Sequence, residues 1–233
     1  MNKIVAIHQP NFFPWLGFFD KIIKSDHFVF FDDVYLSKKG GTWTNRVQVI
    51  ISNNKNWLTV PIDRNFSGQK KINQIKIKNE INWREKLIKS LELNYLKHPF
   101  YNEIYPIISA LINIEKEYLV EFNIQAIKII LENLELTSDK LVLSSELNQS
   151  GSSNQLLVNI TESLKSKIYM CGGGAENYQN ETVFEENDIK LIYQNFLHPT
   201  YPQYNQDKFI EGLSIIDCLM NLGWEKTSEI LKK

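Results

Sequence analysis

Short apolar runs alternate with amphipathic stretches along the chain. Apolar residues cluster in KIVAI at residues 3–7 and in HFVFFDDV at residues 27–34, which ends in two aspartates. They cluster again within KLVLSS, KIYMC and IKLIYQNF toward the carboxyl end. Such continuous runs are typical of parallel strands that are covered on both faces. Helical spacing follows Pro14 and separates the later runs, which gives strand–helix–strand units near both ends of the chain. The pattern predicts an α/β fold with an open, mostly parallel, Rossmann-like sheet.

The middle of the chain follows a different pattern. Turn signals (GG, NN and SG) surround RVQVIIS, WLTVPI and INQIKI, and the last of these alternates like a half-exposed strand. Residues 35–79 are therefore predicted to form a small, β-rich antiparallel excursion. Three amphipathic helices are expected in the insertion at residues 80–136, and a helical tail at 207–232. We expect residues 1–233 to form one domain.

Charge and cysteine content exclude several classes of protein. The 26 basic and 27 acidic residues leave a net charge of -1, which gives no general attraction to nucleic acid or to an anionic membrane. Cys171 and Cys218 have no zinc-type spacing and make a disulfide framework improbable, so no metal site is predicted. No apolar run is long enough to span a bilayer, and the start lacks a signal-peptide pattern. A cytoplasmic protein without membrane insertion is expected.

HQPNFFPWLG, which follows the first predicted strand, is the most restricted stretch of the chain. In an open parallel sheet, ligands bind beyond the carboxyl ends of the strands, so side chains at this turn are candidates for a site. His8 can act as a general base there, or it can be structural. Asn11 can contact a ligand or cap the following helix. The candidate residues of the turn are His8, Gln9, Asn11 and Trp15, whose ring suits a sugar or a base.

Two aspartates and a basic, aromatic segment follow the second predicted strand. Carboxylates at a strand end suit a ribose or sugar hydroxyl or a metal, and turn or cap roles are equally open. Arg46 suits bidentate recognition of a phosphate or carboxylate, or a salt bridge. The substrate-binding candidates here are Asp32, Asp33, Lys38, Trp43, Asn45 and Arg46.

CGGGAENY and HPTYPQY follow two later predicted strands. Successive glycines allow close approach of a backbone to an anion, although they also serve tight turns. A G-x-G-x-x-G dinucleotide fingerprint is absent. A rigid loop with histidine and tyrosine can form a wall of a site. These stretches add the candidates Gly172, Gly173, Gly174, Asn177, Tyr178, His198 and Tyr201.

Taken together, these stretches resemble the WbqC-like family, whose members are encoded in bacterial O-antigen and other surface-polysaccharide gene clusters. The resemblance rests on HQPNFFPWLGFFDKI, FDDVYLSKKGGTWTNRVQV, LTVPI, GGGAENY, FLHPTYPQ and LSIIDCLMNLG, and covers nearly the whole chain. It implies a modifying step on a nucleotide-linked sugar in lipopolysaccharide biosynthesis. The layout is also similar to nucleotidyltransferase-like α/β folds, whose His-x-x-His turn has Asn11 here in place of the second histidine.

The residues and the resemblance leave three functions open. The first is transfer of an acyl or aminoacyl group to the amine of a nucleotide-linked amino sugar, with His8 as general base. Its donor would carry a phosphate, as CoA, a carrier protein or aminoacyl-tRNA does, and no other cofactor is predicted. The second is magnesium-dependent nucleotidyl or adenylyl transfer, and the third is binding of a nucleotide sugar without catalysis. A homo-oligomer is compatible with each of them.

Overall fold

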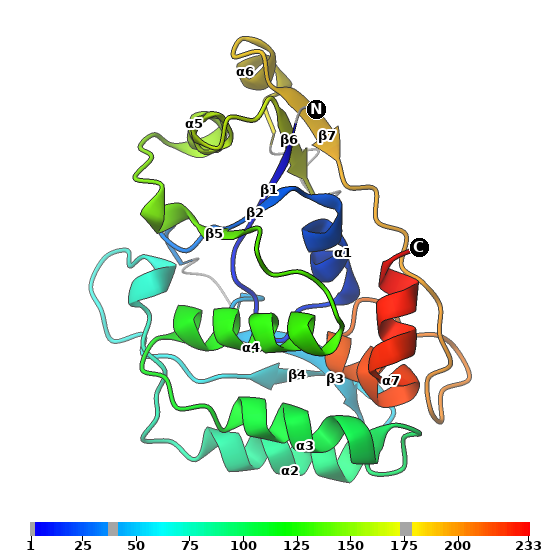
Figure 1. Cartoon of the computed structure of the whole chain (residues 1–233). Helices are drawn as coiled ribbons and strands as arrows, with labels where there is room; N and C mark the ends of the chain where they lie inside the picture. Colours follow the sequence, from blue (N-terminus) through cyan, green and yellow to red (C-terminus); the bar gives the residue numbers. More distant parts are fainter. Residues whose placement is uncertain (1–2, 37–41, 173–178) are drawn as a thin grey trace. The chain divides into compact units, whose positions relative to one another are not determined.

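The computed structural model of the chain describes residues 3–36, 42–172 and 179–233. By the density of their internal contacts, the residues divide into two compact units. The first unit comprises residues 1–9, 17–33 and 137–197, and the second comprises residues 10–16, 34–136 and 198–233. Five parallel strands belong to the first unit, whereas an antiparallel strand pair and most of the helical residues belong to the second (Figure 1).

The first unit is built on the parallel sheet. Its strands are β1 (Ile4–His8), β2 (His27–Phe30), β5 (Leu141–Leu143), β6 (Ile168–Cys171) and β7 (Lys190–Tyr193). They lie in the order β5-β2-β1-β6-β7. The chain therefore first builds outward from β1 through β2 to β5, and then continues on the other side of β1 with β6 and β7. The direction reverses between β1 and β6, and this is the topological switch point of the sheet.

Helices cover both faces of this sheet because parallel crossovers are right-handed. The helix α1 (Leu16–Lys24) connects β1 to β2, whereas α5 (Ser153–Ser163) and α6 (Glu181–Glu185) belong to connections that run in the opposite direction. Side chains alternate accordingly. Phe28, on β2, packs edge-on against Phe18 of α1, whereas the neighbouring Val29 belongs to the cluster formed with α5 and α6.

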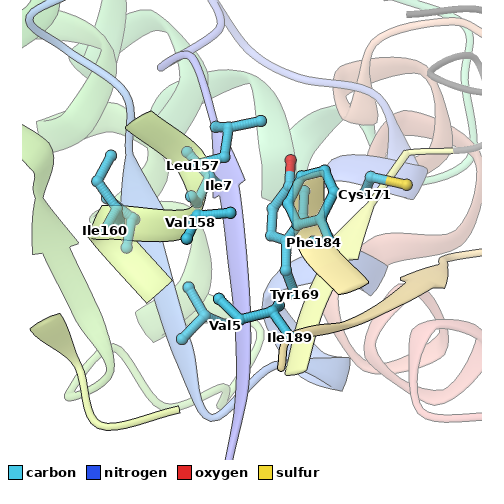
Figure 2. Packing of buried hydrophobic residues seen from close by; sticks show 10 residues of the cluster. Val5, Ile7, Leu157, Val158, Ile160, Tyr169, Cys171, Phe184 and Ile189 are labelled. Atoms are coloured by element: carbon cyan, nitrogen blue, oxygen red, sulfur yellow. The ribbon is translucent and has the colours of Figure 1, made fainter. Parts of the chain in front are cut away.

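Figure 2 shows that cluster of buried apolar side chains. β1 and β6 contribute Val5, Ile7, Tyr169 and Cys171, which pack with residues of α5 and with Phe184 of α6. The rings of Tyr169 and Phe184 are stacked, with their centroids 5.4 Å apart. The cluster explains why the side chains of β1 and β6 on this face of the sheet are apolar.

The second unit combines an antiparallel hairpin with four helices. The hairpin consists of β3 (Arg46–Ile51) and β4 (Asn54–Thr59), and the helices are α2 (Trp83–Tyr95), α3 (Tyr101–Ile112), α4 (Leu119–Asn133) and α7 (Ile215–Leu231). α2 contacts α3 and β3, and α7 contacts α3 and β3. α7 contains a kink at Gly223, where φ is +73°.

The predicted fold class is confirmed, including the parallel sheet, the antiparallel excursion and the helical segment. Two details of the pattern were wrong. INQIKI contains a short 3-10 helix (Ile72–Gln74) and isolated bridges in place of a strand, and the final helix begins at Ile215 rather than at 207. The single-domain organisation stays a prediction. No helix within the described ranges is long and apolar enough to cross a membrane.

Candidate functional site

Two of the predicted motifs lie on adjacent strands at the switch point. His8 is the last residue of β1, and Gly172 directly follows the last residue of β6. β1 and β6 are paired in parallel, and Ala6 lies opposite Met170. Two residues further along each strand direction, His8 therefore lies opposite Gly172. A Cβ atom on Gly172 would meet no heavy atom of the described residues within 4 Å. Among the described residues, none fills the space beside Gly172 at this end of the sheet.

The hydrogen bond of His8 determines its tautomer. Its Nδ1 lies 2.9 Å from the backbone carbonyl oxygen of Gln9. A carbonyl oxygen can only accept, so Nδ1 carries the hydrogen and the lone pair of the neutral ring is on Nε2. Burial, and the nearby charge of Lys21, lower the pKa of His8 from 6.5 to about 4. The imidazole is therefore neutral at pH 7, and its Nε2 can accept a proton. The ring is half-buried and packs edge-on against the Phe18 ring, with the two centroids 5.0 Å apart.

Lys21 is a buried cation of the first unit. It projects from α1, its side chain is buried, and its Nζ donates to the carbonyl oxygen of Ile7 at 3.2 Å. Desolvation lowers the pKa of Lys21 to about 8, and the Cys171 thiol partly opposes this shift. Cys171 is itself buried and its Sγ is 3.5 Å from the carbonyl oxygen of Ile192, which is the setting of a structural thiol.

The two aspartates after β2 are bound to the end of β5. Asp32 Oδ1 accepts from the Ser145 amide at 3.0 Å, and Oδ2 accepts from the Ser145 hydroxyl at 2.7 Å. The Ser144 hydroxyl lies 2.9 Å from Asp32 Oδ1 and 2.5 Å from Asp33 Oδ1, and its one proton can serve one carboxylate at a time. Asp32 therefore fastens β5 to β2, which supports the structural alternative for that residue.

The turn that follows His8 is held by other parts of the second unit. Asn123 of α4 is fully buried and donates to the carbonyl oxygens of Pro10, at 2.9 Å, and Thr44, at 2.7 Å. The amide of Phe12 donates to the carbonyl oxygen of Trp43 at 3.0 Å. Asn11 and Asn45 are both buried, and Asn45 accepts from the amide of Thr42 and donates to the carbonyl oxygen of Val60. These asparagines lie within the framework of the turn.

The half-buried Arg46 and the exposed Trp43 both contact Trp57 of β4. The guanidinium carbon of Arg46 lies 4.1 Å from the centroid of the Trp57 ring, which is a cation–π geometry. The rings of Trp43 and Trp57 are 5.2 Å apart, and these residues are 43% and 39% exposed. The structure thus groups two of the predicted residues on one face of the hairpin.

A second aromatic group surrounds His198. Its ring stacks on Trp15 with the centroids 6.4 Å apart, and it also contacts Phe209. Tyr201 packs against Phe209 and donates through its hydroxyl to Asp217 Oδ2 at 2.9 Å. Trp15, His198 and Tyr201 are therefore brought together in the second unit. Lys38, Gly173, Gly174, Asn177 and Tyr178 lie outside the described residues.

The family model for the WbqC-like protein family matches residues 9–229. The chain belongs to this family. It is also 30% identical over 227 residues to an uncharacterized protein of Mycobacterium tuberculosis (strain H37Rv), and that match covers 96% of this chain and 95% of the relative. No solved structure gives a significant match. The family resemblance noted from the motifs is confirmed.

Three polar residues of this family member were missed by sequence reasoning: Lys21, Asn123 and Asp217. Each is buried, and each lies on a helix among apolar neighbours. Asp217 accepts from Tyr95 at 3.1 Å, from Tyr201 and from Gln203 at 3.0 Å. The one available signal was a polar residue at an apolar position of a helical pattern. No group of three His, Cys, Asp or Glu side chains in the described ranges is placed to hold a metal ion.

Proposed function

We propose that the protein is a transferase of surface-polysaccharide biosynthesis that places an acyl or aminoacyl group on the amine of a nucleotide-linked sugar. The substrate binds at the carboxyl edge of the parallel sheet, between β1 and β6. The observation that carries the proposal is His8, a neutral histidine with its lone pair on Nε2 at the topological switch point. The edge beside Gly172, where no described residue lies within 4 Å of an added Cβ atom, receives the phosphates of the nucleotide.

The reaction requires a free amine. The substrate ammonium first loses one proton to water. The amine nitrogen then forms a bond to the acyl carbon, and the bond from that carbon to the sulfur or oxygen of the donor breaks. The attacking nitrogen gives up its second proton to His8 Nε2, which passes it to the leaving group. With a pKa of about 4, a protonated His8 lies about 4 kcal/mol above the neutral form at pH 7. His8 is therefore protonated only briefly, while it passes the proton from the nitrogen to the leaving group.

The test compares the wild-type protein with His8→Gln. Amino-sugar nucleotides are incubated with acyl-CoA or aminoacyl-tRNA donors, products are identified by mass spectrometry, and substrate binding is measured by calorimetry. Removing a general base lowers turnover by roughly a hundredfold or more, and binding of the sugar nucleotide should change little. His27→Gln is the matched control, because His27 begins β2 at the opposite end of the sheet.

The possible outcomes distinguish the three functions and test the role of His8. Unchanged turnover in His8→Gln contradicts the role of His8. Release of pyrophosphate from ATP or CTP that depends on magnesium indicates nucleotidyl transfer, and tight binding of a nucleotide sugar without turnover with any donor indicates a binding protein. Roles of Trp15, Trp43 and Arg46 in the same reaction stay predictions.

A further inference from the structure

Lys21 differs from the other buried charged residues of the described chain. Asp20 forms a salt bridge with Lys24 and accepts from Gln194, and Asp32 and Asp217 each accept several hydrogen bonds. Lys21 is only 3% exposed, and the described residues provide one acceptor, the carbonyl oxygen of Ile7, for its three N–H groups. No carboxylate within the described ranges forms an ion pair with it.

A buried charge without a partner destabilises a fold. Removal of an ammonium from water costs several kcal/mol, and a single carbonyl oxygen compensates little of it. An apolar side chain of similar length would fill the same space without this cost. The position of Lys21 is therefore unfavourable for stability, and charges in such positions cluster at functional sites.

The location of Lys21 indicates the ligand that its charge would serve. Its Nζ contacts the residue before His8, at the carboxyl end of β1, and its charge acts on the pKa of His8. α1 is held there by Gln194, at the end of β7, which donates to the carbonyl oxygen of Gly17 and to Asp20 at 2.7 Å each. The cation thus lies next to the switch point, where no described residue fills the space beside Gly172.

We infer that Lys21 is the electrostatic anchor of the site, a buried cation that attracts the phosphate or diphosphate group of a ligand entering between the ends of β1 and β6. This inference rests on the proposed function for the identity of the complete substrate. Lys21 is buried, and Coulomb interactions of a buried charge are screened less than those of a charge in water. Lys21 is thus a positioning residue, and His8 remains the group that meets the amine.

The inference predicts a dependence on pH. Lys21 loses its proton above about pH 8, so affinity for an anion should fall between pH 7.5 and about 9.5 by up to tenfold for each pH unit. The titratable groups next to Lys21 are His8 at the end of β1 and Cys171 at the end of β6, with Asp20 and Lys24 on its own helix. All four are retained when Lys21 alone is changed.

The experiment measures binding of inorganic pyrophosphate to the full chain by calorimetry. Lys21→Met keeps the length of the side chain and removes the charge. Lys24→Met is the control, because it makes the same change on the same helix at a side chain that is 47% exposed. We expect the Kd for pyrophosphate to rise at least tenfold in Lys21→Met and less than twofold in Lys24→Met. The urea midpoint of Lys21→Met should equal or exceed that of the wild-type protein.

Two results overturn the inference: no binding of millimolar pyrophosphate by the wild-type protein, or equal affinity in Lys21→Met, whatever the stability of that variant. If Lys21→Met does not fold, the pH series on the wild-type protein decides, and an affinity that stays constant up to about pH 9.5 overturns it. Pyrophosphate binding that depends on Lys21 without transfer to any amino sugar would contradict only the proposed function. Transfer with unchanged pyrophosphate binding in Lys21→Met would contradict only the anchor.

Discussion

Asp217 provides a sharp test of the energetics of the second unit. Its carboxylate is fully buried at the start of α7 and accepts from the hydroxyls of Tyr95 and Tyr201 and from the Gln203 amide. Desolvation raises the pKa of Asp217 from 3.8 to about 6, against the opposing effect of these three donors. The folded protein therefore binds this proton more tightly than the unfolded chain does. Its contribution to stability is complete below about pH 4 and is lost as the pH rises through about 6.

The magnitude follows from the size of the pKa change. A rise of about two pH units corresponds to about 3 kcal/mol of unfolding free energy. Asp217→Asn removes the titration, so the stability of the wild-type protein minus that of Asp217→Asn should fall by about 3 kcal/mol between about pH 4 and pH 7. Other titrating groups are common to both proteins and cancel.

Tryptophan fluorescence during urea unfolding is the appropriate assay. All five tryptophans belong to the second unit, which also contains Asp217: Trp15, Trp43, Trp57, Trp83 and Trp224. A difference that does not change with pH would refute the reasoning. A difference that grows with pH would show that the three donors outweigh desolvation and lower the pKa of the carboxyl.

Three further predictions concern single residues. Asn123→Ala removes two buried hydrogen bonds to backbone carbonyls and should destabilise the second unit by about 2 kcal/mol in urea unfolding; an unchanged midpoint would contradict its role in holding the turn. Gly223→Ala adds a Cβ 2.6 Å from the Phe100 ring at a φ of +73°, and should cost about 3 kcal/mol, part of which Phe100→Ala in the same chain restores. The His8 ring should titrate near pH 4 in NMR spectra and not near 6.5. Because its pKa is lowered in the folded protein, its contribution to stability is lost as the pH falls from about 6.5 to about 4.

Much of the fold could be predicted because its signals are local. Continuous apolar runs such as KIVAI and KIYMC indicated strands covered on both faces, and β1 and β6 are such strands. The order of the strands has no local signal, because it depends on which side of β1 each crossover runs. INQIKI shows the opposite case. Its alternation fits a strand, but Ile72 and Ile75 are both fully buried and three residues apart, the spacing of a single 3-10 turn.

The candidate site could be predicted only in part from the sequence, because the partners of its side chains are distant along the chain. Residue type and position at a strand end made His8 and Gly172 candidates, and the structure brings them together at the ends of the adjacent strands β1 and β6. Asp32 has the same sequence signal, but its oxygens are bound by Ser145, which is 113 residues away along the chain. The partners of a polar side chain are set by tertiary contacts. Lys21 was missed because the sequence does not show that the described residues place no carboxylate in an ion pair with it.

The backbone of HQPNFFPWLG is restricted because this turn connects segments that belong to different units. His8 and Gln9 belong to the first unit, residues 10–16 to the second, and Gly17 to the first again. The turn must therefore end a strand, satisfy the contacts of Asn123, and begin a helix within ten residues. Phe13 has a φ of +38°, unusual for a bulky residue, and the Ser214 hydroxyl donates to its carbonyl oxygen at 2.7 Å. Such strain persists only where the surroundings fix the backbone, and Pro10 and Pro14 limit the alternatives still further. Within the first unit, the Gln9 carbonyl oxygen accepts from His8 Nδ1 and orients the imidazole, so the group that begins the turn sets the direction in which Nε2 points.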